Sequence, residues 1–209
     1  NFFFFWLYNL GIKPGDKIAI IANNRPEWNF TDYAIQQVGA ISVPIYPTIS
    51  ETDLAFILND ATVKYLFISS KELYAKLKST IDNAPSIKDV YAFNSFSECK
   101  HWTLLLEDGK KNPKASEIES IKQTIQTNDL LTILYTSGTT GTPKGVMLSH
   151  DNLISNSLAS QTLAPFTSDW KALSFLPLNH VYERMLTTLY LYLGVSIYYA
   201  ESMDTIVDN

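Results

Sequence analysis

The chain alternates short apolar runs with amphipathic stretches along most of its 209 residues, and this alternation limits its fold more than any other feature. The apolar runs have the length and residue types of buried strands, and the stretches between them place apolar residues at helical spacing. Strands that alternate with helices form parallel or mixed sheets with helices on both faces. We therefore predict an α/β fold in which helical layers cover the two faces of a sheet.

The boundaries of these elements follow from turn residues and helix-capping signals. Strands are predicted at residues 16–22, 41–46, 63–69, 89–93, 130–134, 146–148 and 171–176. Helices are predicted from Pro26 to Gly39, after a capping box at 50–53, at 70–79 and 115–125, and from about 151; residues 185–200 predict a helix, a turn and a strand. In the first long helix, Phe30, Ala34 and Val38 lie four residues apart on one apolar face. The span 94–113 mixes turn residues, charges and an apolar run and gives no single prediction.

A loop rich in glycine and hydroxyl groups follows the apolar run 130–134. Residues 135–145 read Tyr-Thr-Ser-Gly-Thr-Thr-Gly-Thr-Pro-Lys-Gly. Glycines let backbone amides approach a bound group closely, and successive amides form a concavity that binds anions. The alternative is an ordinary surface hairpin, but five hydroxyl residues, three glycines and a lysine in eleven residues favour a polyphosphate site. The predicted phosphate-binding residues are Thr136, Ser137, Gly138, Thr139, Thr140, Gly141 and Lys144.

This loop differs from the common nucleoside-triphosphatase loop. Counted from Gly138, that pattern requires glycine, lysine and a hydroxyl residue at 143–145, where this chain has Pro143, Lys144 and Gly145. The common loop also runs directly into a helix, whereas residues 146–148 are apolar and predict a strand. We therefore expect the loop to lie between two strands.

The loop and a second block of residues resemble a known family. Residues 135–145 match throughout the phosphate-loop signature of the adenylate-forming enzymes, which comprise acyl-CoA synthetases, luciferases and the adenylation domains of peptide synthetases. Leu-Pro-Leu-Asn-His-Val-Tyr-Glu-Arg at 176–184 resembles the family's next motif in the form used by long-chain fatty-acyl-CoA synthetases. Residues 15–20, 24–28 and 43–48 are similar to the same branch. The resemblance thus extends along nearly the whole chain.

This resemblance implies a two-step reaction. A fatty-acid carboxylate attacks the α-phosphate of ATP, which is accompanied by magnesium, and pyrophosphate leaves; the thiol of coenzyme A then displaces AMP from the acyl-adenylate. The loop residues would hold the β- and γ-phosphates. Two alternatives stay open: an adenylating enzyme for an aryl or amino acid, and a non-catalytic nucleotide-binding module.

His180 is the candidate catalytic residue that the resemblance implies, because it would donate a hydrogen bond beside the carboxylate and the α-phosphate. From the sequence alone, a histidine satisfied locally, for example by Glu183, is equally acceptable. Glu183 and Arg184 could form a structural ion pair or shape the acyl tunnel.

The family's later motifs for adenine, ribose and metal have no counterpart among these residues, nor has its mobile C-terminal domain with a catalytic lysine. The chain also begins at Asn1 without a methionine. We therefore expect residues 1–209 to form an incomplete N-terminal AMP-binding domain that is inactive by itself.

Composition limits the partners. A net charge of −5, a pI near 5.2 and scattered lysines argue against nucleic-acid binding. The single Cys99 suits a reducing compartment, so we expect a cytoplasmic protein. The aromatic run 2–8 is far shorter than the ~20 residues that span a bilayer. It predicts a buried helix in preference to an interfacial one, and the latter would give peripheral membrane association.

Overall fold

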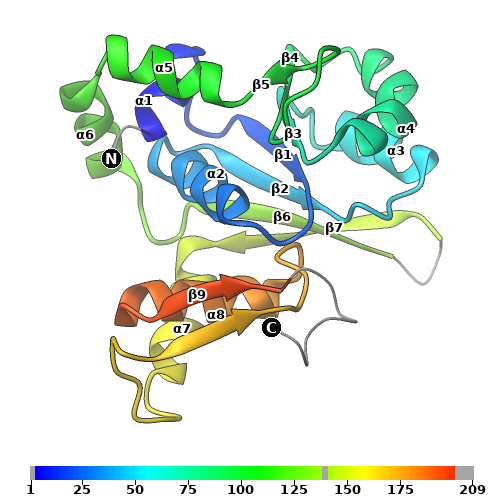
Figure 1. The fold of residues 1–209 in the computed structure, drawn as a ribbon. Helices are drawn as coiled ribbons and strands as arrows, with labels where there is room; N and C mark the ends of the chain where they lie inside the picture. Colours follow the sequence, from blue (N-terminus) through cyan, green and yellow to red (C-terminus); the bar gives the residue numbers. More distant parts are fainter. Residues whose placement is uncertain (1–2, 138–140, 201–209) are drawn as a thin grey trace.

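The computed structural model describes residues 3–137 and 141–200 (Figure 1). The strands are β1 (Lys17–Ile21), β2 (Ile41–Ile45), β3 (Tyr65–Ile68), β4 (Asp89–Ala92), β5 (Lys100–His101), β6 (Leu130–Ser137), β7 (Pro143–Ser149), β8 (Lys171–Ser174) and β9 (Ser196–Tyr199). The helices are α1 (Phe3–Asn9), α2 (Pro26–Gln37), α3 (Glu51–Asp60), α4 (Lys71–Asp82), α5 (Thr103–Lys111), α6 (Ala115–Thr124), α7 (His150–Ser160) and α8 (Val181–Leu193).

Seven strands form one sheet in the order β5-β4-β3-β1-β2-β6-β7. Each neighbouring pair is parallel except β6 and β7, which form an antiparallel hairpin. Strands β8 and β9 form a separate parallel sheet, with α8 as the connection between them. Parallel strands require such a crossover, because a tight turn can join only antiparallel neighbours.

Helices cover both faces of the large sheet. Side chains alternate between the faces of a strand, and in β1 all four residues after Lys17 are fully buried. Ile18 and Ile20 pack in a cluster with Trp6 of α1 and Ile35 of α2. Their neighbours Ala19 and Ile21 pack in a second cluster that includes side chains of α3 and α4. This arrangement confirms the predicted α/β class with its helical layers.

Local signals placed most elements correctly. Ser50 caps α3, where its hydroxyl accepts a hydrogen bond from the backbone N–H of Asp53 at 3.0 Å. Ser149 caps α7 with the reciprocal bonds of a capping box. One expectation needs correction, and one span without a prediction is now assigned. Phe30 is 47% exposed, because the buried side of α2 is formed by residues that include Trp28 and Asp32. The span 94–113 contains β5 and α5.

Helix α1 buries two of its four described side chains, Trp6 and Leu7, and Tyr8 and Asn9 are half-buried. Trp6 and Leu7 are inaccessible to solvent, and the Trp6 ring meets Phe67 of β3 edge-on at 5.5 Å. Phe2 and the side chains of residues 3–5 lie outside the described part. The burial of Trp6 and Leu7 agrees with the favoured reading of the aromatic run.

Within the described residues, no helix is both long and apolar enough to cross a membrane.

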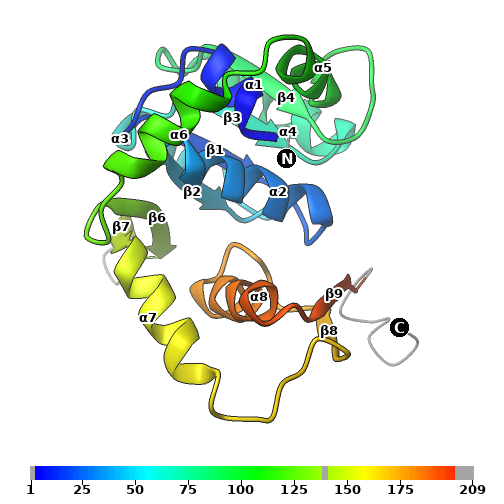
Figure 2. The same ribbon diagram turned by 90° about the vertical axis from the view of Figure 1, so that its left-hand side faces the viewer.

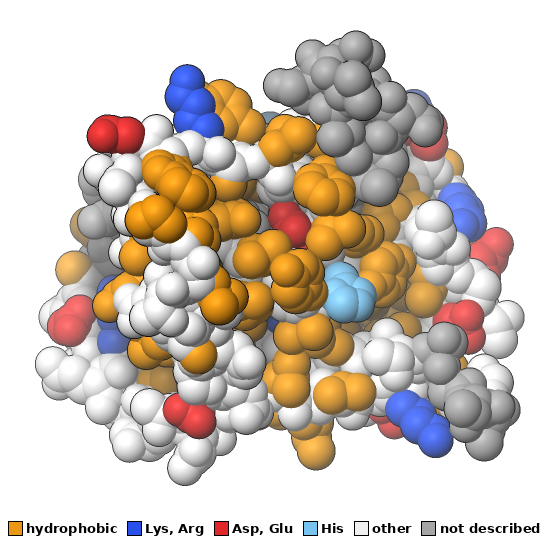
Figure 3. All heavy atoms as spheres, turned by 90° about the horizontal axis from the view of Figure 1, so that it is seen from below, with side chains coloured by type: hydrophobic (Ala, Val, Ile, Leu, Met, Phe, Trp, Pro, Cys, Tyr) orange, Lys and Arg blue, Asp and Glu red, His pale blue; other side chains and the backbone are white. Residues whose placement is uncertain are grey.

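Residues 150–200 form a second unit that lies below the large sheet in both ribbon views (Figures 1 and 2). Helix α7 packs on β7 and α8, and α8 packs on β8 and β9. Seen from below, this unit presents many apolar side chains (Figure 3). Its exposed apolar residues include Ile154, Leu158, Tyr182, Leu191, Tyr192 and Tyr198.

Candidate functional site

A cavity of about 580 Å³ lies where β2 and β6 reach their carboxyl ends. Ligands of open α/β sheets bind at this edge of the strands. Three segments form the walls: the residues after β2 that lead into α3, the far end of the β6–β7 hairpin, and the start of α8. The lining residues are Tyr46, Thr48, Ile49, Ser50, Asp53, Ile57, Leu134, Tyr135, Thr136, Gly141, Pro143, Asn179, His180 and Val181.

The structure brings three of the predicted site residues together, since Thr136, Gly141 and His180 line this one cavity. Lys144 is exposed on β7 opposite Thr136 and does not line it. Ser137 ends β6, and its side chain is not described.

The predicted phosphate-binding residues Gly138, Thr139 and Thr140 lie outside the described residues.

The predicted loop does lie between two strands. Tyr135 pairs with Gly145, Thr136 with Lys144, and Ser137 with Pro143 across the hairpin. Gly141 adopts a φ of +84°, in the left-handed region that favours glycine. The helix expected after the second strand begins at His150, so the chain departs from the nucleoside-triphosphatase pattern as predicted.

His180 is the N-cap residue of α8, and its side chain is exposed at the cavity. Its Nδ1 accepts a hydrogen bond from the backbone N–H of Tyr182 at 3.2 Å. A neutral imidazole that accepts at Nδ1 carries its proton on Nε2, so Nε2–H is the donor available to a ligand. The local hydrogen-bond partner of His180 is therefore the backbone of α8, and the suggested partner Glu183 does not take that place.

Two asparagines hold the loop that precedes His180. Asn24 donates to Ser174 Oγ at 3.1 Å and to the Leu176 carbonyl at 2.7 Å, and it accepts from the Leu178 N–H at 2.9 Å. Asn179 is buried and donates to the carbonyl of Ile45, the last residue of β2. The loop is thus attached to the ends of the first two strands, which places His180 at the cavity mouth.

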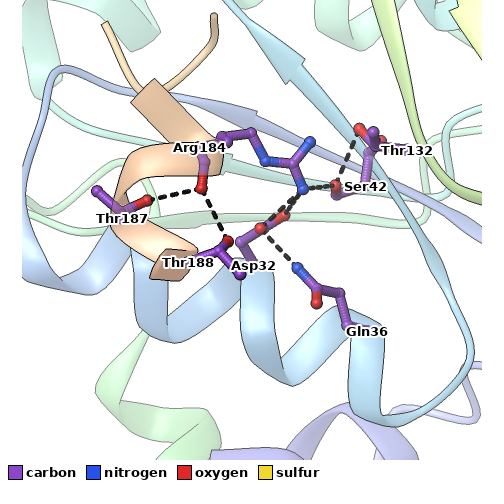
Figure 4. Close-up of polar contacts among 7 residues, drawn as sticks. All are labelled: Asp32, Gln36, Ser42, Thr132, Arg184, Thr187 and Thr188. Carbon is purple, nitrogen blue, oxygen red and sulfur yellow. Dashed lines mark hydrogen bonds and ion pairs between the residues drawn. The ribbon is translucent and has the colours of Figure 1, made fainter. Parts of the chain in front are cut away.

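A buried ion pair fixes α8 against the large sheet (Figure 4). Arg184 Nη2 donates to both carboxylate oxygens of Asp32 at 2.9 and 2.8 Å and to Ser42 Oγ at 3.1 Å. The two charged residues are only 2% and 3% exposed. Arg184 therefore pairs with α2, and the suggested ion pair between Glu183 and Arg184 is wrong.

The network continues into the strands that lead to the cavity. The Ser42 hydroxyl in β2 donates to Thr132 Oγ1 at 3.2 Å, and the Thr132 hydroxyl in β6 donates to the Ser42 carbonyl at 2.8 Å. Gln36 donates to Asp32 at 2.8 Å, and the Arg184 guanidinium lies 5.7 Å from the Trp28 ring centre. One set of buried contacts thus sets the relative position of β2, β6 and α8.

Glu183 is also buried, on the side of α8 that faces β8. Burial raises the pKa of its carboxyl group, and a hydrogen bond with Ser174 opposes that shift. This carboxyl group supports the small sheet and contributes no lining to the cavity.

Within the described residues, no three or more His, Cys, Asp and Glu side chains are grouped so that they could hold a metal ion. The polar groups that line the cavity and could contact a metal ion are mainly hydroxyls, amides and the carboxylate of Asp53. Magnesium that arrives with nucleotide phosphates keeps several waters and needs few protein ligands.

Sequence reasoning missed several of these residues. Asp32 and Arg184 are 152 positions apart, so no local pattern joins them. The one signal in the sequence was the position of Asp32, a carboxylate that lies between the apolar residues Trp28 and Ile35 at helical spacing. Tyr46, Thr48 and Asn179 line the cavity from within blocks that resembled the family, although no role was predicted for them.

A sequence profile of the family described as AMP-binding enzyme matches residues 5–209. The chain belongs to this family. It is 35% identical over 216 residues to long chain acyl-CoA synthetase 6, peroxisomal, of Arabidopsis thaliana, covering 97% of this chain and 30% of that protein. It is 32% identical to fatty acyl-CoA synthetase A of Dictyostelium discoideum, covering 91% of this chain and 29% of that protein. The chain therefore spans less than a third of the length of these relatives.

A solved structure of a Mycobacterium tuberculosis fatty acyl CoA synthetase has the same fold. It superposes with a TM-score of 0.82 at 22% identity, over 100% of this chain and 40% of that chain. The family and the fold class expected from residues 135–145 and 176–184 are thus confirmed.

Proposed function

We propose that residues 1–209 form part of the AMP-binding domain of a long-chain fatty-acid:CoA ligase and that the cavity beside β6 binds ATP. The observation that carries this proposal is the meeting of Thr136, Gly141 and His180 in one cavity at the carboxyl ends of parallel strands. The relatives are named long chain acyl-CoA synthetase and fatty acyl-CoA synthetase, and these names support a long-chain fatty acid as the proposed substrate.

The chemistry proposed for the protein has two steps. In the first, a carboxylate oxygen of the fatty acid forms a bond to the α-phosphorus of ATP while the bond to pyrophosphate breaks. In the second, the thiolate of coenzyme A attacks the acyl carbonyl carbon, and AMP leaves. Enzymes of phosphoryl and acyl transfer act mainly by holding the reactants and stabilising charge that develops.

Each predicted site residue has a role in this scheme. The hydroxyls of Thr136, Ser137, Thr139 and Thr140, the amides at Gly138 and Gly141, and the Lys144 ammonium would hold the β- and γ-phosphates and so favour departure of pyrophosphate. His180 Nε2–H would donate to the oxygen that carries growing charge between the carboxylate and the α-phosphate. Bound magnesium would neutralise part of the phosphate charge.

We also propose that the 209-residue chain does not activate fatty acids by itself, because it spans less than a third of its relatives. Cytoplasmic localisation and peripheral contact with membranes stay predictions. Separating soluble from membrane fractions of cells tests both.

Fatty-acid-dependent exchange of radiolabelled pyrophosphate into ATP tests the function. We expect exchange by the full-length protein with long-chain acids, strong loss of exchange in His180→Ala, and none from the 209-residue chain. Exchange only with aryl or amino acids would show a different adenylating enzyme, and ATP binding without acyl-AMP would show a non-catalytic module. Exchange by the short chain at the full-length rate would contradict the expected inactivity.

A further inference from the structure

Tyr135 joins two walls of the cavity. It lies in β6 two residues before that strand ends, and its hydroxyl donates to Asp60 Oδ2 at 2.5 Å. Asp60 is the last residue of α3, and Phe56 of the same helix meets the Tyr135 ring edge-on at 6.4 Å and 84°. Helix α3 also lines the cavity through its first turns. One tyrosine thus connects the base of the phosphate loop to the helix opposite.

The Tyr135 ring also lies close to Gly145. A Cβ atom added at this glycine would lie 2.9 Å from Ile133 Cγ2 and 3.2 Å from Tyr135 Cζ, closer than side-chain carbons normally approach. Gly145 is absent from the positive-φ glycines of the described residues, whereas Gly141 is one of them. The two glycines therefore serve different purposes, and Gly145 makes room for the ring of its cross-strand partner.

This part of the hairpin needs support from outside the sheet. In the described ladder, β2 pairs with β6 at Ser42 and Thr132, and the residues of β6 beyond this point pair with β7. The hairpin reaches past the end of β2, with α3 above it in Figure 1. The hydrogen bond to Asp60 and the ring contact with Phe56 therefore add support to the loop end of the hairpin from outside the sheet.

We propose that Tyr135 is a positioning residue for the nucleotide phosphates, which fixes the phosphate loop against α3 through its hydrogen bond to Asp60. This inference rests on the proposed function, because it requires that the loop bind the phosphates of ATP. Tyr135 itself need not contact the nucleotide. It acts by setting the distance between the hairpin and the α3 wall.

The hydroxyl remains a donor throughout the physiological range. Burial, together with the hydrogen bond to Asp60 and its negative charge, raises the pKa of Tyr135. A protonated tyrosine beside a carboxylate forms a charge-assisted hydrogen bond, which is stronger than a neutral one.

The test compares variants of the full-length protein in the exchange assay. Tyr135→Phe keeps the ring and removes the hydroxyl, Asp60→Ala removes the acceptor, and Asp60→Asn keeps an acceptor oxygen. Tyr91→Phe is the matched control, because it removes a tyrosine–aspartate hydrogen bond of 3.0 Å to Asp89. Both residues lie on β4, near the edge of the sheet opposite to β6 and β7. Thermal melting checks that each variant is folded.

We expect the KM for ATP to rise about tenfold in Tyr135→Phe and in Asp60→Ala, as for loss of one charge-assisted hydrogen bond. The double variant should show the same rise, because both changes remove one interaction. Asp60→Asn keeps a neutral acceptor and should raise the KM for ATP by less than Asp60→Ala does. Tyr91→Phe should stay within about twofold of the unmodified protein, and the KM for the fatty acid should stay within about twofold in every variant.

An unchanged KM for ATP in Tyr135→Phe and Asp60→Ala, with active unmodified protein, would overturn the inference and leave the proposed function intact. A product of the two single effects in the double variant, or an equal rise in both KM values, would also overturn it. If the unmodified protein does not bind ATP, the proposed function fails and this inference fails with it.

Discussion

The two sheets of this molecule differ in how completely they are covered. Strands β1, β2 and β3 of the large sheet are buried at nearly every residue, whereas β8 and β9 bury only Ser174 completely. Strand β7, at the edge of the large sheet, is mostly exposed and carries Met147 at 69% exposure. Since burial of apolar surface is the main source of folding stability, we infer that most of the stability resides in the first sheet. The candidate site lies where the two units meet.

The largest expected effect comes from the centre of the large sheet. Phe67 of β3 is fully buried, and its ring contacts Trp6, Tyr91 and Phe93. Phe67→Ala should lower the free energy of unfolding by about 4 kcal/mol, because it leaves a cavity among these rings. In β9, Tyr198→Ala should cost less than about 0.5 kcal/mol. Urea unfolding measures both, and equal losses would contradict the comparison.

Breaking the ion pair between Asp32 and Arg184 should destabilise the second unit more than the large sheet. Arg184→Ala leaves Asp32 charged and buried, and we expect a loss of about 3 kcal/mol. Hydrogen exchange should show that protection falls in α7, α8 and the small sheet before it falls in β1 to β3.

Two controls test that interpretation. Lys78→Ala, which removes an exposed pair with Asp82, should leave stability nearly unchanged. Asp32→Leu combined with Arg184→Leu should recover most of the stability, since a buried apolar pair avoids the desolvation of charges. A uniform loss of protection over the whole chain in Arg184→Ala would argue against two units of different stability.

Gly145→Ala tests the junction between the hairpin and α3. The added methyl group would overlap with Ile133 and Tyr135, and overpacking of this kind costs about 1–3 kcal/mol. We expect a loss near 2 kcal/mol in urea unfolding, together with weaker ATP binding. Unchanged stability would mean that the Ile133 and Tyr135 side chains both shift to accommodate the methyl group.

A smaller and pH-dependent effect is expected at Glu183. Its pKa is raised in the folded state, so the folded protein binds the proton more tightly than the unfolded chain does. Stability is therefore lost as the pH rises from the ordinary carboxyl value through the raised one. Glu183→Gln should be more stable than the unmodified protein at pH 7, and this gain should vanish in acid. A gain that is the same at every pH would exclude burial of the charge as its cause.

The smallest effect should come from the exposed apolar face of the second unit. Tyr192→Lys should change the free energy of unfolding by less than about 0.5 kcal/mol, because the side chain is exposed on α8. Binding of a dye that fluoresces on apolar surfaces should nevertheless decrease for the 209-residue chain. Unchanged dye binding would show that this face is not the one that the dye detects.

Elements with local signals could be predicted from the sequence, and elements defined by distant partners could not. Ser50 and Ser149 predict the starts of α3 and α7, because a capping side chain bonds to a backbone N–H only three residues further along the chain. Helix α5 gave no such signal, since Trp102 precedes it without a side-chain cap and is fixed instead by packing on Phe93.

The same distinction applies to the site. The glycine-rich loop at 135–145 is continuous in sequence, so its position between two strands was predictable from residues 130–148. The ion pair that positions α8 was not, because Asp32 has its charged partner in a helix near the other end of the chain. Tyr135 was visible as part of the motif, but its partner Asp60 lies 75 residues away.

The separation of Asp32 and Arg184 also has a consequence for how the molecule forms. Contacts between residues far apart in sequence are slow to form, because closing the long intervening chain costs conformational entropy. Helix α8 makes its buried contact with Ser42, which is itself hydrogen-bonded to Thr132, so we expect α8 to dock after β2 and β6 have paired. We therefore expect the loop that carries His180 to reach its final position late in folding, after the β6–β7 hairpin has formed.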